Sequence, residues 1–556
     1  MDKRERKKNS FEEQTYEFAR QWARGIGRRE FLKYAGVSAG AAALGPYLSA
    51  GTRGRVPVAE AAGTPKRGGV IKIGRISDSD TLDPQKTTLL AAHEIMTQIY
   101  DPLIYLDAAG KVFPALAKSW EFSNDNKTVT FKLEQGVRFH DGSPFNAAVM
   151  KWTVERQLAK ETASPTAWML GPIESVQVID EYTVAYNYKE PFVPLWVGLS
   201  YSYCAPISKT AVEKLGDDFG RNPVGTGPFR FVSWEPDKGI TLKRYEDHRV
   251  ASPYFRNRGA PYLDGAQFIV IPEDATRLSA LRSGDIDMIA GSDAVPIDKI
   301  QALQRTKGIQ VETAPQVGLV YAYINTTYGP LGDKRVRKAI NFAVDKQKMI
   351  KLVLGGNAQP AYSPVASAYS SVYYADVRKI GYDYDLQKAK ALMKEAGQEA
   401  GFKMDFLLLD GPIFRRIGEV VKEDLSKINI DVRLQSLPVA ELFAKGPEKA
   451  SGMYFFWYTY SDPDIVYQML HSGESICWSF HENPELDRLI EKQRVEFDPE
   501  KRKRIFHRIQ EIAVDEAYWL YLYEGKYIGA MRDYVHGVWF DPLGFIHLQD
   551  MWMDKA

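Results

Sequence analysis

The chain has 556 residues, of which 45% are hydrophobic and 26% are charged, and its formal net charge is +1. This length suffices for several packed domains of about 150 residues each, and the charged fraction is typical of a folded protein in water. Residues 1–62 carry 12 Lys and Arg against 7 Asp and Glu, which leaves 60 basic and 64 acidic residues for the remainder. A slightly acidic body has no basic surface for nucleic acid, so that class of partner is excluded.

The N-terminal segment, residues 1–62, has the pattern of an export signal. Arg28 and Arg29 are followed by one spacer, two large apolar residues and a lysine, and then by an Ala- and Gly-rich run over 34–50. This run is shorter than the roughly 20 apolar residues that span a bilayer. The order resembles a twin-arginine signal peptide. We therefore expect export of the folded protein, cleavage near residue 61 and a periplasmic mature chain; retention of the signal as an anchor stays open.

After this segment the pattern alternates between strands and helices. A strand over 70–74, a polar loop and a helix over 90–105 begin an α/β unit. Further strands are expected over 128–133, 176–188, 229–234, 240–245 and 267–271, and further helices over 146–158 and 274–283. From about residue 314, helices capped by Asp333, Asp385, Asn483 and Asp498 alternate with strands over 402–409, 430–437 and 453–458.

The sequence lacks the common motifs of catalysis and metal binding. Its eight His show no metal-ligand spacing, and His140, at a turn, is interpreted as structural. Cys204 and Cys477 either pair in the oxidising periplasm or stay buried as free thiols. We predict no catalytic residue, no metal and no cofactor. The alternative is a secreted enzyme, a hydrolase or a cofactor-dependent one, exported in its folded state by the twin-arginine route.

Several short motifs occur in a fixed order over about residues 66–545, and each of them is weak alone. They are Thr81–Pro84, Phe113–Glu121, Gly136–Gly142, Gly225–Phe229, Val336–Ile340, Ala343–Lys346 and Asp462–Asp464. Together they resemble the family-5 extracellular solute-binding proteins of peptide/nickel-type ABC importers. The resemblance implies an α/β fold of the two-lobed periplasmic-binding-protein type, a clamshell with an additional inserted α+β domain. It also implies a solute handed to an ABC permease and its ATPase.

The domain boundaries follow from the pattern and the resemblance together. We expect lobe I to be discontinuous, with an inserted α+β domain and a second lobe that closes over the ligand. The expected ranges are 63–107, 225–313 and 531–556 for lobe I, 108–224 for the inserted domain and 314–530 for lobe II. The protein is expected to be a monomer.

Three loops follow predicted strands and are candidates for the solute site, because open α/β units bind ligands beyond the carboxyl ends of their strands. We call Ser77–Leu90 the first loop, Asp410–Arg416 the second loop and Thr459–Asp464 the third loop. The candidate ligand-binding residues in and beside them are Thr87, Thr88, Arg415, Trp457, Tyr458, Thr459 and Asp462.

The aromatic and cationic candidates each have two interpretations. Side chains alternate along a strand, so one of Trp457 and Tyr458 is expected in the pocket and the other in the core. Arg415 either binds a carboxylate or phosphate of the ligand with two hydrogen bonds, or it is a solvated side chain at a helix start.

The third loop departs from what the resemblance implies for peptide-binding members, which usually carry an Asp that pairs with the peptide ammonium. An alignment on Asp462 puts Thr459 at that position, and Thr88 stands where an acidic residue is expected in the first loop. Burying an ammonium without a carboxylate is costly, so an opine, a glycoside, a capped peptide or a metal chelate is favoured over a free peptide. An alignment shifted by three residues instead makes Asp462 the anchor of a peptide.

Overall fold

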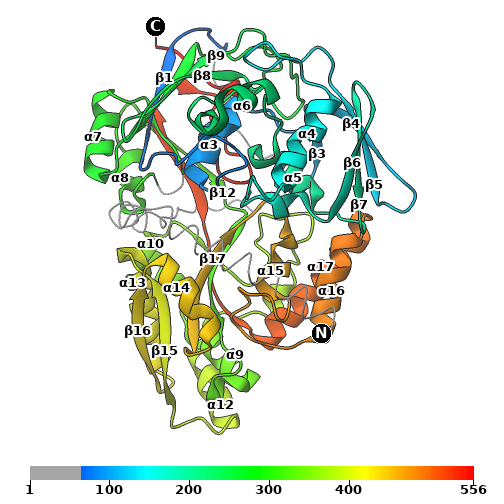
Figure 1. The fold of residues 1–556 in the computed structure, drawn as a ribbon. Coiled ribbons are helices and arrows are strands. Elements are labelled where there is room, and N and C mark those ends of the chain that lie inside the picture. The colour runs from blue at the N-terminus through cyan, green and yellow to red at the C-terminus, as the bar shows by residue number, and fades with distance from the viewer. Residues whose placement is uncertain (1–63, 292–293, 556) are drawn as a thin grey trace. The chain divides into compact units, whose positions relative to one another are not determined.

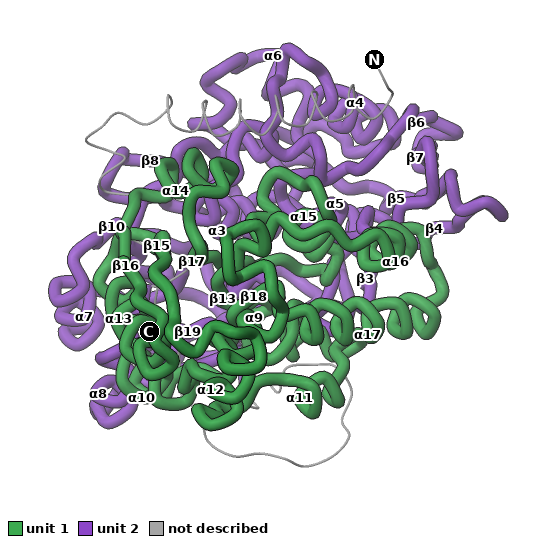
Figure 2. Tube along the Cα trace, turned by 90° about the horizontal axis from the view of Figure 1, so that it is seen from below, with its two compact units in different colours: residues 1–49, 315–526 green, residues 50–314, 527–556 purple. Residues whose placement is uncertain are grey.

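The computed structural model describes residues 64–291 and 294–555. They form two compact units (Figure 2): unit 1 holds residues 315–526, and unit 2 holds the described residues up to 314 together with those from 527 onward. The chain thus passes between the units twice. The predicted export signal, with Arg28, Arg29 and the cleavage site, lies outside the described residues.

Unit 2 is built on a seven-stranded sheet with the order β12-β19-β11-β1-β10-β9-β8 (Figure 1). The strands are β1 (Val70–Arg75), β8 (Phe229–Glu235), β9 (Gly239–Arg244), β10 (Gly265–Val270), β11 (Met288–Ile289), β12 (Ile309–Pro315) and β19 (Lys526–Arg532). Because β1 pairs in parallel with both β10 and β11, these three strands end at the same edge of the sheet. Helix α7 (Asp274–Ser283) packs on β1 and β11, and α3 (Leu90–Ile99) packs on β8.

A second, four-stranded sheet of unit 2 lies within the predicted inserted domain. Its order is β4-β5-β7-β6. Its strands are β4 (Ala117–Phe122), β5 (Thr128–Leu133), β6 (Ile173–Asp180) and β7 (Thr183–Tyr188), and α4 (Ala147–Leu158) packs on β6 and β7. In β5 the predicted strand is confirmed, and Val129, Phe131 and Leu133 on one of its faces are all buried. The assignment of 108–224 to a domain of its own stays a prediction.

Unit 1 is built on a six-stranded mixed sheet with the order β14-β18-β13-β17-β15-β16. Its strands are β13 (Gly318–Ile324), β14 (Gln359–Pro360), β15 (Phe402–Leu409), β16 (Ile430–Leu437), β17 (Met453–Thr459) and β18 (Trp519–Glu524). β15 runs parallel to β16 and β17, whereas β13 is antiparallel to both β17 and β18. The carboxyl ends of β15, β16, β17 and β18 therefore meet at one edge.

The capping residues predicted for the helices of unit 1 are confirmed. Side chains of Asp333, Asp385, Asn483 and Asp498 accept hydrogen bonds from the first turns of the helices that follow them. These helices are α9 (Lys334–Ala343), α12 (Leu386–Glu395), α16 (Pro484–Val495) and α17 (Pro499–Glu516), and α10 (Lys346–Leu354) and α13 (Pro412–Ser426) complete the longer helices. Short polar residues at these positions satisfy backbone N–H groups that have no partner within the helix.

Three predicted boundaries are wrong. The helix expected over 90–105 ends at Ile99, because the chain turns extended at Tyr100, two residues before Pro102. The strand expected over 176–188 is the hairpin of β6 and β7. The second loop is shorter than predicted, since α13 already begins at Pro412.

Within the described residues, the structure contains no helix that is both long and apolar enough to cross a membrane.

Candidate functional site

The carboxyl edge of the unit 1 sheet brings together two of the three predicted loops. The second loop follows Leu409 of β15, and the third loop follows β17, whose last residue Thr459 pairs with Gly318 at the start of β13. Tyr460 of the third loop donates its backbone N–H to the Val317 carbonyl (3.1 Å). The third loop is thus fixed to the chain that enters β13.

The aromatic candidates separate as the strand alternation predicts. Tyr458 is buried, and its hydroxyl donates to the Pro364 carbonyl (2.7 Å). Trp457, on the opposite face of β17, is half-buried. Of the pair, Trp457 is therefore the less buried side chain.

Thr459 and Asp462 have protein partners. The Thr459 hydroxyl accepts from Gln316 Nε2 (2.8 Å). Asp462 is paired through both carboxylate oxygens with Arg502, at 2.7 and 3.0 Å, and it also accepts from the Asp464 backbone N–H (2.7 Å). The carboxylate that would restore a peptide anchor in the third loop is thus neutralised within unit 1.

A second acidic side chain of the third loop is Asp464. Asp464 is buried and forms an ion pair with Arg494 (3.2 Å), and Gln493 donates to the same carboxylate oxygen. Burial raises the pKa of Asp464 to about 6. The two carboxylates of this segment are therefore held by side chains from α16 and α17.

Arg415 lies in the first turn of α13 and is exposed, with 62% of its side chain accessible. Its guanidinium donates to Asp410 (3.2 Å), the first residue of the second loop. An exposed pair of this kind is weak, so the guanidinium can exchange Asp410 for an anionic ligand at little cost.

The candidates of the first loop lie in unit 2. Thr87 is buried, donates to Asp80 Oδ1 (2.9 Å) and accepts from the Leu89 backbone N–H (2.9 Å). Its hydroxyl thus shapes the loop. Thr88 is partly exposed.

Sequence reasoning missed a buried carboxylate at the carboxyl edge of unit 1. Glu524, the last residue of β18, is 3% exposed. It accepts from Gln359 Nε2 (2.6 Å), from the Ser367 backbone N–H (3.1 Å) and from the Ser367 hydroxyl. Burial raises its pKa. In the sequence, the only indication of this site is a single Glu at the end of the apolar run Trp519–Tyr523. Its partners lie more than 150 positions away, so no local pattern indicates that they contact Glu524.

The turn at His140 is held by contacts within unit 2, and its interpretation as structural stays a prediction. One ring nitrogen of His140 contacts the Gly227 carbonyl (2.9 Å), and Asp141 accepts from the hydroxyls of Ser143 and Ser208. These contacts tie the turn to the segment before β8.

Cys204 and Cys477 are buried free thiols. They belong to different units, and burial raises the pKa of each to about 12. In the part of the chain that the structure describes, no three His, Cys, Asp or Glu side chains are grouped so as to hold a metal ion.

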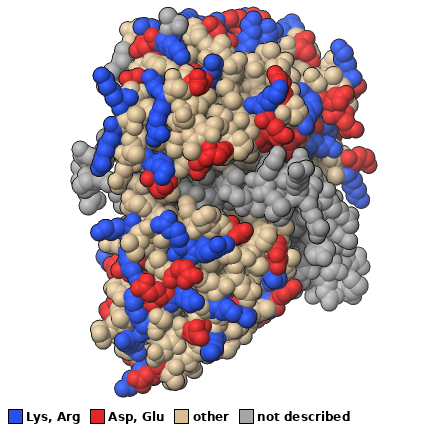
Figure 3. Space-filling view, turned by 90° about the vertical axis from the view of Figure 1, so that its left-hand side faces the viewer, with Lys and Arg blue, Asp and Glu red and all other residues tan. Residues whose placement is uncertain are grey.

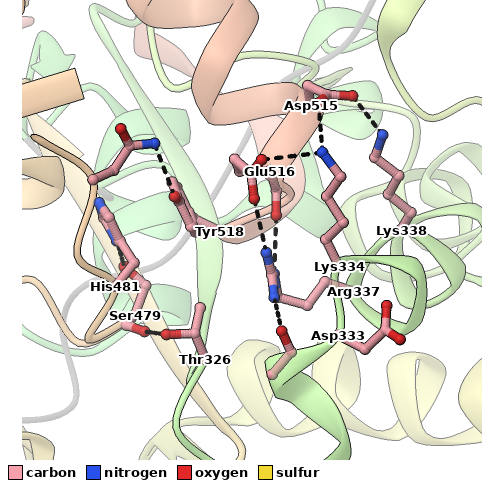
Figure 4. Close-up of polar contacts among 12 residues, drawn as sticks. Thr326, Asp333, Lys334, Arg337, Lys338, Ser479, His481, Asp515, Glu516 and Tyr518 are labelled. Carbon is pink, nitrogen blue, oxygen red and sulfur yellow. Dashed lines mark hydrogen bonds and ion pairs between the residues drawn. The ribbon is translucent and has the colours of Figure 1, made fainter. Parts of the chain in front are cut away.

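Polar networks elsewhere in unit 1 connect helices (Figure 4). Arg337 of α9 donates to the Glu516 carbonyl (2.9 Å) and pairs with its carboxylate, while Lys334 and Lys338 pair with Asp515. On the face drawn in Figure 3, basic and acidic side chains are interspersed, as expected from the near-neutral balance of charge.

Comparisons with known proteins identify the family. The model of the bacterial extracellular solute-binding proteins, family 5, middle region, matches residues 111–476. The glutathione-binding protein GsiB of Salmonella typhi is 27% identical over 491 residues, which cover 85% of this chain and 92% of that protein.

Solved structures agree with this assignment. The periplasmic binding protein DppA of Helicobacter pylori, in complex with the peptide STSA, is 26% identical with a TM-score of 0.72, over 88% of this chain and 99% of that one. AgaA of A. tumefaciens R10, in complex with agropinic acid, is 23% identical with a TM-score of 0.70, over 88% and 99%, and shows the fold alone. The predicted two-lobed α/β fold is confirmed. The chain belongs to the bacterial extracellular solute-binding proteins of family 5, and it is the substrate-binding component of an ABC importer.

Proposed function

We propose that the chain captures a small peptide-like or other polar solute in the periplasm, after removal of its signal peptide, and delivers it as a monomer to an ABC permease. It acts by binding, without catalysing a reaction. The relatives support this solute class, since they include a glutathione-binding protein and a protein solved with a peptide.

The observation that carries the proposal is the composition of the carboxyl edge of unit 1. It presents a half-buried Trp457 and an exposed Arg415, while Asp462 is neutralised by Arg502. An aromatic face suits apolar and planar parts of a solute, and a guanidinium suits its carboxylate. Where the solute carries an ammonium, unit 1 offers it no free carboxylate in the third loop. An opine therefore remains as suitable as a peptide, and a glycoside or a metal chelate less so.

A ligand panel tests the proposal. Thermal shift and titration calorimetry with glutathione, short peptides, opines, glycosides and metal chelates are expected to show binding of an anionic, peptide-like member. Arg415→Ala is expected to weaken that binding at least about tenfold, the effect of losing one charged hydrogen bond.

Arg416→Ala is the matched control, because Arg416 lies beside Arg415 on α13 but donates to the Leu352 carbonyl (2.8 Å). Unchanged affinity in Arg415→Ala would remove Arg415 from the site. Binding of a glycoside or a chelate, and of no anionic solute, would overturn the proposed class.

A further inference from the structure

We propose that Arg75 and Glu94 of unit 2 bind the amino-acid head of the solute, a group in which an ammonium and a carboxylate stand on the same carbon. The proposal rests on the function proposed above and specifies its solute class. It assigns to unit 2 the binding of a zwitterionic group.

The pair lies where an α/β unit binds its ligands. Arg75 is the last residue of β1, and Glu94 lies in α3, which follows the first loop. β1 and β11 are parallel, with Gly74 paired to Ile289, so both strands end at the edge where the first loop begins. Ligands of open α/β units bind beyond this edge of the sheet.

Both side chains are buried but incompletely satisfied. Each is 3% exposed, and Arg75 Nη2 lies 3.5 Å from Glu94 Oε2. Arg75 Nη2 also donates to the Ala91 carbonyl. Among the described residues, Arg75 Nε, Arg75 Nη1 and Glu94 Oε1 have no hydrogen-bond partner. Buried polar groups in native proteins are nearly always paired, so a polar group that the described residues do not supply is expected here.

The unused atoms define the chemistry of that group. Two guanidinium nitrogens, Nε and Nη1, call for an acceptor, and one carboxylate oxygen calls for a donor. A lone carboxylate would be attracted by Arg75 but repelled by Glu94 only 3.5 Å from it, and a lone ammonium would meet the opposite problem. An amino-acid head carries both charges on adjacent groups, so it satisfies both side chains and leaves the total charge of the site unchanged.

The backbone at Gly291 lies close to the Glu94 carboxylate. A Cβ built on Gly291 would lie 3.2 and 3.3 Å from the two carboxylate oxygens, and Gly291 has a φ of +105°. A larger residue there would be strained and would press on the carboxylate. Glycine at this position therefore keeps the oxygens of Glu94 available.

The test compares two tripeptides of the same composition by titration calorimetry. Reduced glutathione is γ-linked, so its glutamate keeps an ammonium and a carboxylate on one carbon; the α-linked Glu-Cys-Gly lacks that pair. We expect the wild-type protein to prefer glutathione by at least about tenfold, as for one charged hydrogen bond. Glu94→Gln, which has nearly the same shape, should remove most of this preference by weakening glutathione alone.

Glu213→Gln is the matched control in unit 2, since Glu213 is 62% exposed and pairs only loosely with Lys209 (3.6 Å). Arg75→Lys serves as a second variant, and a thermal melt establishes that each variant is folded. If wild type binds both tripeptides equally, or if Glu94→Gln keeps the preference, the pair holds an internal water only and the zwitterion site is wrong, whereas the proposed function stands. If wild type binds no peptide-like solute, both proposals fail.

Discussion

At the scale of single residues, burial decides which charged side chains remain available for function. Asp462 and Asp464 lie in the third loop, yet both are engaged by arginines, Arg502 and Arg494. Removing one partner of a buried pair leaves a costly unpaired charge, so these carboxylates support the loop and are poorly suited to exchange partners with a ligand. Arg415 is exposed, so it can exchange its protein partner Asp410 for a ligand more easily.

His481 is expected to make the stability of unit 1 depend on pH. It is buried, stacks on Tyr518 with ring centroids 3.7 Å apart, and its Nδ1 lies 2.8 Å from the Ser479 hydroxyl (Figure 4). Burial lowers its pKa from 6.5 to about 3. The folded protein therefore keeps His481 neutral, and its stability is full above pH 6.5 and falls as the unfolded chain takes up a proton below that pH.

At pH 5 the protonation of His481 in the unfolded chain lowers the free energy of unfolding by about 2 kcal/mol. Urea unfolding at pH 7.5 and at pH 5 measures how much unfolding free energy the protein loses between the two pH values. In His481→Gln this loss is expected to be about 2 kcal/mol smaller than in the wild-type protein. An equal loss in both proteins would contradict the assignment of the pH dependence to His481.

At the scale of elements, the ends of α9 and α17 are joined by one buried guanidinium. Arg337 is 4% exposed at its side chain and donates to the carbonyls of Leu331, Gly332 and Glu516. The planar guanidinium presents five N–H donors in a fixed fork, whereas an ammonium has only three donors. Lys334, by contrast, pairs with Asp515 and Glu516 at the surface.

Arg337→Lys is therefore expected to lower the free energy of unfolding of unit 1 by about 3 kcal/mol, as for a broken buried network. Lys334→Ala should cost less than about 1 kcal/mol, as for an exposed ion pair. The midpoint and slope of urea unfolding measure both values. A smaller loss in Arg337→Lys than in Lys334→Ala would show that the buried network does not join the helices.

The sequence predicts elements better than contacts, for reasons visible in particular residues. The boundaries of β5, β15 and β16 are correct because apolar runs or alternation end at turn residues there. The pairing of Asp462 with Arg502 joins positions 40 residues apart, and no local pattern encodes it.

The candidate binding residues were likewise harder to predict from the sequence than the helices and strands. That Trp457 is the more accessible of the two aromatic residues could be anticipated only as one of two alternatives, since alternation fixes opposite faces but not which face is covered. Arg75 and Glu94 were not anticipated at all, because their unsatisfied atoms appear only once the fold has buried them.

At the scale of the whole molecule, the chain forms two α/β units and passes between them twice. A solute that binds only the native state stabilises the protein by RT ln(1 + [L]/Kd), so a retained solute also raises the melting temperature. Family membership and the fold both favour such a retained solute over chemical turnover.

Native mass spectrometry of the exported protein, purified without added ligand, tests most directly whether it holds a solute. The account predicts a 1:1 complex with one small anionic solute that carries an amino-acid head and leaves on denaturation. A stoichiometric redox cofactor, or a chain that carries no solute and takes up none from a periplasmic extract, would contradict it.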